Sequence, residues 1–546
     1  MQISKQFVQV GARRVLVRYA GRGPAIVLLH QSPQNSSALI PWIERLASRY
    51  AVFAPDTPGF GDSDPLPLAQ PEIPDYAAAV AALLDALGIG RAMVYGVHTG
   101  AVTALRLALD FPDKVAVLVC DGYARFGAAD REALLANYLP PFEPSWDGTH
   151  LIWLFARLRE QHLFFPWNDG SQAARLAYPL PGPEHIHNDV MHVLAAGDGY
   201  RVGYRAPFLY DDQTAAARLT PPAYIFYRAE DVLAPHLRRL PALPANVIAE
   251  LVDGGPPALV VKADAAFSAH AKGATVIDSA ACVDGARATT RALIALSEGE
   301  LAYRLIPGNG MEVVVFLHDI GSPARIPVTR DHAATTLLPD LPGHGASREW
   351  SADRCVPDVI ARALAALLDA LGFEAIAIMA IGGSCPIAIA LAHHIGTRCT
   401  KLTLQNAIAL DVAERAQFLS LLPDLTPTST GAQLLTAWNY ARMKYLFWPW
   451  IPQDSRAVRQ TMAPAPRRVH ADAVEILRAG NCFRPLWREA LTMDIARSIN
   501  GIHCPVELLS ADEPEPMRLA ARLASAAGLA PVDAAAKNEG LKTWQK

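Results

Sequence analysis

The 546-residue chain has few of the features that direct a protein to a membrane or to nucleic acid. No apolar stretch reaches the roughly 18 uninterrupted residues of a transmembrane helix. The first residues lack the apolar core and cleavage site of a signal peptide. The net charge is only −4 and the basic residues are dispersed, which gives no support for a phosphate-binding surface. We therefore expect no membrane and no nucleic-acid partner.

Paired cysteines and metal-binding motifs are also missing. The seven cysteines are an odd number, are scattered and form no CxxC pair, a usage typical of free thiols in a reducing cytoplasm. HExxH, clustered Cys and His, and a strand-linked GxGxxG do not occur, so the sequence predicts neither a metal nor an organic cofactor. Hydrophobic residues make up 51% of the chain, which indicates packed globular domains. The expected ligand is a small molecule.

A pattern in the first half of the chain recurs in the second. Leu-Asp-Ala-Leu-Gly occurs at 84–88 and at 368–372, and other segments match in the same register. The chain is too long for a single core. We expect two domains, residues 1–298 and 299–546, joined by a linker near 297–304.

Short apolar runs bounded by Gly, Pro and Asp predict buried parallel strands of an α/β sheet. In the first half these runs are residues 25–29, 50–54, 93–95 and 115–120. Helical stretches such as 76–87 separate them. After the sixth strand each half carries a further helical stretch, which we expect to form a cap at about 123–215 and at about 408–495.

The segment Gly96-Val-His-Thr-Gly100 ends an apolar strand and opens an apolar helix. With Leu28-Leu-His30 and the Asp-Thr-Pro-Gly-Phe-Gly of 56–61, it resembles the bacterial α/β-hydrolases whose nucleophile elbow is G-x-H-T-G. The resemblance implies two tandem α/β-hydrolase-fold domains, each a mostly parallel sheet flanked by helices with a helical cap. It also implies a hydrolase, although this superfamily includes lyases and non-enzymatic relatives.

The catalytic residues depart from the usual pattern. In working members a Ser, Asp or Cys at the elbow attacks the substrate, and a His held by an acid activates it. Here His98 stands at the elbow, and Gly382 stands there in the second half. The usual histidine is missing around 278–287 and after His503. We expect the second domain to be degenerate, truncated and inactive, packed against the first as an intrachain pseudo-dimer.

His98 is expected at the carboxyl end of the sheet, where ligands bind in α/β folds. A general base, a nucleophile and a proton shuttle are all compatible with imidazole. We favour a general base that activates water against a small, mostly apolar ester, thioester or C–C substrate. Asp121 is the preferred orienting acid and Asp231 the alternative, while the backbone N–H groups of Gln31 and Thr99 would form an oxyanion hole.

Several other side chains are expected near the substrate. They are His30, Phe164, Trp167, His187, Arg201, Arg205 and His270. The aromatic side chains would suit an apolar ligand and the arginines a carboxylate. In the alternative, the aromatic residues form the core of the cap and the arginines form surface ion pairs.

Ser384 is the candidate nucleophile of the second half, with helix capping as the alternative. A catalytically inactive binding or scaffold protein and a cofactor-free lyase or isomerase remain open as other functions.

Overall fold

The computed structural model describes residues 2–310, 312–325, 334–447, 450, 457–459, 463–511 and 513–530. The chain divides into two compact units. The first contains Met1–Glu143 and Trp153–Thr289, and the second contains Pro144–Ile152 and Thr290–Lys546. None of the helices in the described part of the chain is both long enough and apolar enough to cross a membrane.

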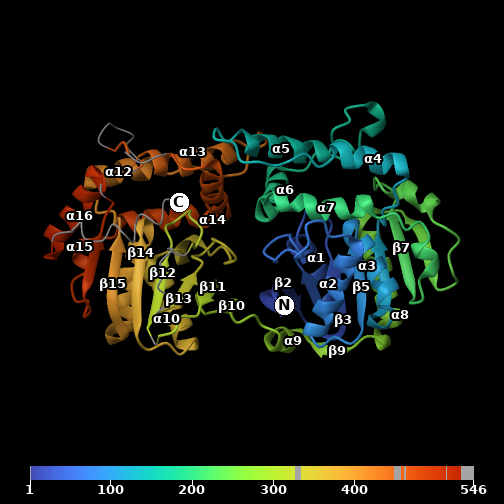
Figure 1. The fold of residues 1–546 in the computed structure, drawn as a ribbon, viewed down its shortest axis with the longest axis horizontal. Helices are drawn as coiled ribbons and strands as arrows, with labels where there is room; N and C mark the ends of the chain where they lie inside the picture. Colours follow the sequence, from blue (N-terminus) through green and yellow to red (C-terminus); the bar gives the residue numbers. More distant parts are fainter. Residues whose placement is uncertain are drawn as a thin grey trace. The chain divides into compact units, whose positions relative to one another are not determined.

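The first unit is built on one sheet, in which Figure 1 labels β2, β3, β5 and β7. Its strand order is β1-β2-β4-β3-β5-β6-β7-β8. The strands are β1 Ser4–Val10, β2 Arg13–Ala20, β3 Arg22–Leu29, β4 Ala51–Pro55, β5 Ala92–Val97, β6 Val115–Asp121, β7 Ala223–Arg228 and β8 Val247–Val252, and β9 Val276–Asp278 pairs with β3. Strands β1, β2 and β4 pair antiparallel, and β4 through β8 pair parallel. The predicted mostly parallel sheet is confirmed, and the four predicted apolar runs correspond to β3, β4, β5 and β6.

Helices cover both faces of this sheet because successive side chains of a strand point to opposite sides. Val27 and Leu29 of β3 pack in one core with helices α2 and α3, whereas Ile26 and Leu28 pack in the other with α1 and α8. The helices are α1 Ile40–Leu46, α2 Ile73–Ala86, α3 Thr99–Asp110, α8 Gly255–His270 and α9 Ser279–Gly285.

A helical insertion lies between β6 and β7, in the range predicted for the first cap. It contains α4 Ala128–Asn137, α5 Thr149–Gln161, α6 Pro183–Ala196 and α7 Tyr200–Leu209. Its residues Pro144–Ile152 group with the second unit, so helix α5 begins in one unit and ends in the other.

The second unit has a sheet with the order β10-β11-β13-β12-β14-β15-β16, in which β13 through β16 are parallel. Its strands are β10 Arg291–Ala295, β11 Glu300–Ile306, β12 Val313–Leu317, β13 Thr335–Pro339, β14 Ile376–Ile381, β15 Cys399–Gln405 and β16 Val506–Leu509. Its helices are α10 Pro357–Ala370, α11 Cys385–Ile395, α12 Val412–Ser420, α13 Ala432–Leu446, α14 Pro466–Thr492, α15 Ile495–Ser498 and α16 Pro514–Ala527. Helices α12, α13 and α14 lie between β15 and β16, in the range predicted for the second cap.

The linker predicted near 297–304 does not exist as a linker. Ala295 of β10 pairs with Glu300 of β11, so the predicted boundary at 298 falls in the turn of a β-hairpin. The unit boundary lies earlier, between Thr289 and Thr290. The last strand of the second unit, β16, takes the place that β7 has in the first, and Asp512, which comes shortly after it, lies outside the described residues.

Candidate active site

His98 lies on a sharp turn between β5 and α3, with φ of 47° and ψ of −108°. A side chain is strained in this region of φ. The two flanking glycines are required by close contacts. A Cβ on Gly96 would lie 2.2 Å from the carbonyl oxygen of Gly100, and a Cβ on Gly100 would lie 2.3 Å from that of Leu29. The spacing Gly-x-His-x-Gly therefore follows from the packing of this elbow against β3.

The imidazole of His98 is held by a buried carboxylate. Its Nε2 lies 2.9 Å from Oδ2 of Asp231, which follows β7, and the side chains are 26% and 3% exposed. Nδ1 has no hydrogen-bond partner among the described residues. A Cβ on Gly122, where φ is +67°, would lie 2.7 Å from Cδ2 of His98, so this glycine leaves the space that the ring occupies.

The preferred assignment of Asp121 as the orienting acid is wrong, because the hydrogen bond of His98 goes to Asp231. Asp121 instead accepts a hydrogen bond from the hydroxyl of Tyr95 at 3.0 Å and lies 3.3 Å from Nε of Arg228. Another nitrogen of Arg228 donates to Asp231. The guanidinium therefore joins the two carboxylates. The sequence analysis did not single out Arg228, the last residue of β7, or Tyr95 of β5, because neither belongs to a recognised motif position.

The charges of this network favour a basic imidazole. Burial lowers the pKa of His98, but the neighbouring carboxylate of Asp231 more than offsets this effect and leaves the pKa raised. Burial raises the pKa of Asp231, yet His98 and Arg228 hold it well below its usual range. Burial also raises the pKa of Asp121. Asp231 is thus the ionised partner that stabilises a protonated His98.

The backbone beside the elbow carries the two N–H groups expected for an oxyanion hole. Thr99 is the first residue of α3, where an N–H has no partner within the helix. Gln31 follows β3, and no acceptor for its N–H is found in the described part of the chain. His30 is buried and fixes this loop, because its Nδ1 donates to the carbonyl of Gln31 at 3.0 Å and its Nε2 accepts from the N–H of Thr57 at 3.0 Å. His30 therefore supports the loop rather than lining a pocket.

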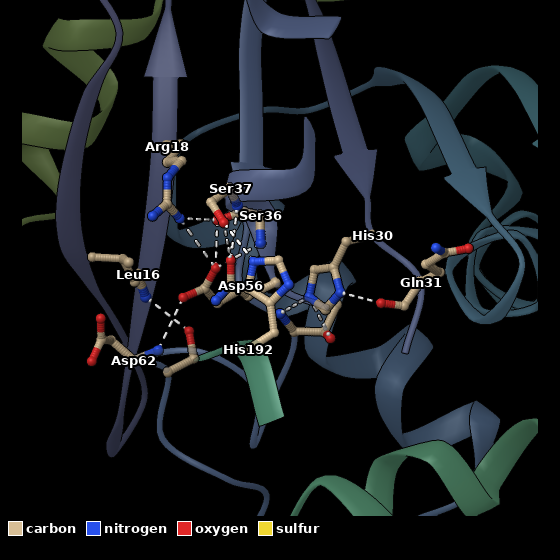
Figure 2. Close-up of polar contacts among 12 residues, drawn as sticks. Leu16, Arg18, His30, Gln31, Ser36, Ser37, Asp56, Asp62 and His192 are labelled. Atoms are coloured by element: carbon tan, nitrogen blue, oxygen red, sulfur yellow. Dashed lines mark hydrogen bonds and ion pairs between the residues drawn. The ribbon is translucent and has the colours of Figure 1, made fainter. Parts of the chain in front are cut away.

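Figure 2 shows Asp56 at the centre of the polar contacts that hold the rest of this loop. Its Oδ1 accepts hydrogen bonds from the backbone N–H of Ser36 at 2.9 Å and from the hydroxyl of Ser36, and it lies 3.4 Å from Arg18. Its Oδ2 accepts from the N–H of Asp62 at 3.0 Å. A Cβ on Gly61 would lie 2.0 Å from that oxygen. The Asp-x-Pro-Gly-x-Gly segment is therefore a structural clamp for the loop that carries Gln31.

The two aromatic residues predicted near the substrate belong to the packing of the cap. Trp167 donates from Nε1 to the carbonyl of Tyr138 at 2.9 Å, and the buried guanidinium of Arg157 lies 5.4 Å from its ring. Phe164 stacks in the same way against Arg175, also at 5.4 Å. These contacts agree with the alternative in which the aromatic residues form cap core.

The charged residues predicted near the substrate are engaged elsewhere. Arg201 forms two hydrogen bonds of 2.6 Å with Asp198, and Arg205 lies 3.4 Å from Gln70. His187 is half-buried on α6, and burial lowers its pKa.

His270 ends α8 and lies 3.3 Å from the hydroxyl of Tyr224. Tyr224 is near the start of β7, whereas Asp231 follows its end. His270 therefore lies at the opposite edge of the sheet from His98, and its prediction as a pocket residue is wrong.

Ser384 of the second unit is not placed as a nucleophile. Its side chain is fully buried, and its hydroxyl lies within donating distance of two carbonyls, those of Ile381 at 2.9 Å and Leu317 at 3.1 Å. It also accepts from the N–H of Ile381, so it closes the turn that precedes α11. Gly382 occupies the elbow tip with φ of +57°, as the alignment of the halves predicts.

In the second unit a carboxylate contacts the backbone N–H that follows the elbow tip. Asp319 follows β12 as Gln31 follows β3, and its Oδ1 accepts from the N–H of Gly383, the residue after the elbow tip, at 2.8 Å. Its Oδ2 pairs with Lys444 of α13 at 2.7 Å, and both side chains are buried. Sequence reasoning missed this pair. The repeated strand-His segment at 315–318 was the signal that could have drawn attention to the residue after it.

Comparisons with known proteins agree with the fold of the first unit. The family model for the alpha/beta hydrolase fold matches residues 24–240. An uncharacterised protein of Mycobacterium bovis is 38% identical over 21% of this chain and 33% of its own length. The 2-hydroxy-6-oxo-6-phenylhexa-2,4-dienoate hydrolase of Burkholderia cepacia is 30% identical over 21% of this chain and 42% of its own. The chain thus spans less than half the length of these curated relatives.

Among solved structures, epoxide hydrolase A of Mycobacterium thermoresistibile is 22% identical, with 50% of this chain and all of that one covered at a TM-score of 0.39. The family model therefore identifies residues 24–240 as a domain of the alpha/beta hydrolase fold.

Proposed function

We propose that the first unit is a hydrolase in which His98 acts as a general base. Its substrate would be a small, mostly apolar ester or thioester, or a compound that is cleaved at a C–C bond. The hydrogen bond from Nε2 of His98 to Asp231 is the observation that carries the proposal. With Nε2 donating to a carboxylate, the lone pair of the neutral ring is on Nδ1, which has no partner among the described residues. The dyad then has the base and the orienting acid of a catalytic triad without its serine.

The proposed reaction uses water as the nucleophile. Nδ1 of His98 removes a proton from water as the water oxygen forms a bond to the substrate carbonyl, and the carbonyl oxygen becomes an anion. The N–H groups of Gln31 and Thr99 would stabilise this anion, a role supported by the hydrogen bond of His30 to the Gln31 carbonyl and by the place of Thr99 at the helix start. Collapse of the intermediate breaks the bond to the leaving group, which takes the proton from the imidazolium. Asp231 stabilises the positive charge of His98 between the two steps.

We further infer that the two units arose by duplication and that the second is inactive. The order β4-β3-β5-β6-β7 corresponds to β13-β12-β14-β15-β16, and His318 contacts its loop as His30 does. Inactivity is supported by Gly382 at the elbow and by the carboxylate of Asp319 on the N–H of Gly383. A developing oxyanion would have to displace that carboxylate.

The test is turnover of a panel of p-nitrophenyl esters and acyl thioesters by the full chain and its variants. We expect His98→Ala to lower kcat/KM by about 10²- to 10⁴-fold, the usual contribution of a general base. His270→Ala is the matched control, because it removes a half-buried histidine of the same unit at the opposite edge of the sheet. Ser384→Ala tests the second unit and should leave turnover unchanged. Equal activity of His98→Ala and wild type would refute the proposal.

Oxygen from ¹⁸O-labelled water separates hydrolysis from lyase or isomerase chemistry. Hydrolysis places one labelled oxygen in the acid product, whereas a lyase or isomerase places none. Loss of turnover with His98→Ala but without label in the product would keep the role of the histidine and refute the hydrolase.

A further inference from the structure

Two histidines and an aspartate of the cap converge on one point outside the elbow. His162 follows the end of α5, and His185 and Asp189 lie one turn apart on α6. Nε2 of His162 lies 2.8 Å from Oδ2 of Asp189, and Nε2 of His185 lies 3.7 Å from the same oxygen. One nitrogen or oxygen from each of the three residues lies within 4.8 Å of the other two.

Hydrogen bonding accounts for only part of this arrangement. His162 is within hydrogen-bond distance of Asp189, but His185 is not, and its ring has no hydrogen bond among the described residues. The side chain of His185 is 59% exposed and that of Asp189 only 11%. The solvated imidazole of His185 thus lies beside the carboxylate of Asp189, which is hydrogen-bonded to His162, without forming a hydrogen bond to it.

The distances match the spacing of ligands around a small cation. Atoms bound tetrahedrally at 2.0–2.1 Å from zinc lie about 3.3 Å apart. The two measured separations from Oδ2 of Asp189, 2.8 and 3.7 Å, lie on either side of this value. The ligand nitrogens of the two histidines lie within 4.8 Å of each other, so a bound ion would draw the rings together, and the exposure of His185 leaves the remaining position to water.

The other oxygen of the Asp189 carboxylate is hydrogen-bonded, as is usual for carboxylates that bind a metal. Oδ1 of Asp189 accepts a hydrogen bond from Nε2 of Gln34 at 3.3 Å. One turn further along α6, Nε2 of His192 lies 2.9 Å from the hydroxyl of Ser37, and Figure 2 shows His192 reaching this loop. These two contacts fix α6 and hold Asp189 with Oδ2 toward the histidines.

We propose that His162, His185 and Asp189 bind a divalent first-row transition cation, with Zn²⁺ as the expected ion. Two imidazoles and one carboxylate are the borderline ligands that Zn²⁺ and its neighbours prefer, whereas Mg²⁺ and Ca²⁺ require mostly oxygen. The ion would lie in the cap and would tie the end of α5 to α6. None of its three ligands is among the residues proposed for the chemistry of His98. Sequence analysis predicted no metal because the three ligands belong to no contiguous motif.

The test measures binding rather than turnover, so it is independent of the proposed function. The full chain is stripped with a chelator and titrated with Zn²⁺ by calorimetry and with Co²⁺ by visible absorption, which reports tetrahedral coordination. We expect one equivalent to bind and His185→Ala to weaken binding by at least the ~10- to 100-fold typical of losing an outer-shell partner. His185 is exposed, so this variant should fold, which circular dichroism checks.

His187→Ala is the matched control, because His187 lies on the same helix two residues from His185 and outside the cluster. It should bind as wild type does. The proposal is overturned if wild type binds no Zn²⁺ or Co²⁺, if His185→Ala binds as tightly as wild type, or if both histidine variants lose the same affinity. Asp189→Asn provides a second variant and should also abolish the tetrahedral Co²⁺ spectrum.

Discussion

Replacing Gly122 by alanine tests how the active-site imidazole is held. The new Cβ would lie 2.7 Å from Cδ2 and 3.0 Å from Nε2 of His98, whereas carbon atoms in contact normally lie 3.5–4.0 Å apart. The ring would have to move by about 1 Å, which breaks its 2.9 Å hydrogen bond to Asp231. The φ of +67° adds strain of about 1–2 kcal/mol for any side chain.

Gly88 allows the two costs to be separated. Its φ is +68°, and a Cβ there would have nothing within 4 Å. Gly88→Ala should therefore lose only the strain. Gly122→Ala should lose a further 1.5–3 kcal/mol or so, the usual contribution of a hydrogen bond to a charged group. Denaturant unfolding measures both losses.

Two further readouts connect this prediction to the site. The pKa of His98, followed by NMR of its imidazole, should fall in Gly122→Ala because the carboxylate of Asp231 is what raises it. Turnover should fall by about 10²- to 10⁴-fold in Gly122→Ala and stay unchanged in Gly88→Ala. The reasoning is refuted if both variants lose the same stability and the pKa of His98 stays raised.

Three other predictions follow from charged and titratable groups. If His98 acts as a base, kcat/KM should fall as the pH drops through a raised pKa, and Asp231→Asn should move that limb to lower pH; a limb that stays in place would contradict the pairing. Lys444→Met leaves the buried carboxylate of Asp319 unpaired and should cost about 3–5 kcal/mol in denaturant unfolding, most of it recovered when Asp319→Asn is added. Burial lowers the pKa of His344 to about 3, so between about pH 6.5 and pH 3 the unfolded chain binds one more proton than the folded chain. The free energy of unfolding should therefore fall by up to about 1.4 kcal/mol for each pH unit of acidification across this range. His344→Asn should flatten this slope.

The sequence predicted the part of the fold that depends on local patterns. Apolar runs that are buried on both faces, such as 25–29 and 115–120, indicate parallel strands without knowledge of their neighbours. The elbow was also recognisable, because close contacts with the backbone of Gly100 and Leu29 require glycine at positions 96 and 100, and these two glycines are part of the motif. The hairpin at 291–306 was missed because its turn at Gly299 was taken for a linker.

Side-chain partners were harder to predict than strands. Asp121 ends β6 and Asp231 closely follows β7, at the same edge of the sheet, so position alone could not decide between them. The choice depends on Arg228, which bridges both carboxylates, and on Tyr95, which satisfies Asp121 and leaves Asp231 for His98. Such a choice belongs to three-dimensional packing and to no single segment.

The two elbows have the same kind of backbone turn but differ in their polar contacts. In the first unit, the strain of His98 at φ of 47° is offset by a hydrogen bond from its Nε2 to a carboxylate. The carboxylate does not contact the neighbouring N–H of Thr99, for which the described residues offer no acceptor. In the second unit, Gly382 removes the strain, and the carboxylate of Asp319 lies on the N–H of Gly383. In each unit a carboxylate contacts the elbow, and the two elbows differ in which group that carboxylate contacts. In the proposed mechanism, the carboxylate on the ring would make His98 a stronger base and leave the N–H groups beside it available to an oxyanion, whereas the carboxylate on the N–H of Gly383 would compete with an oxyanion for that donor.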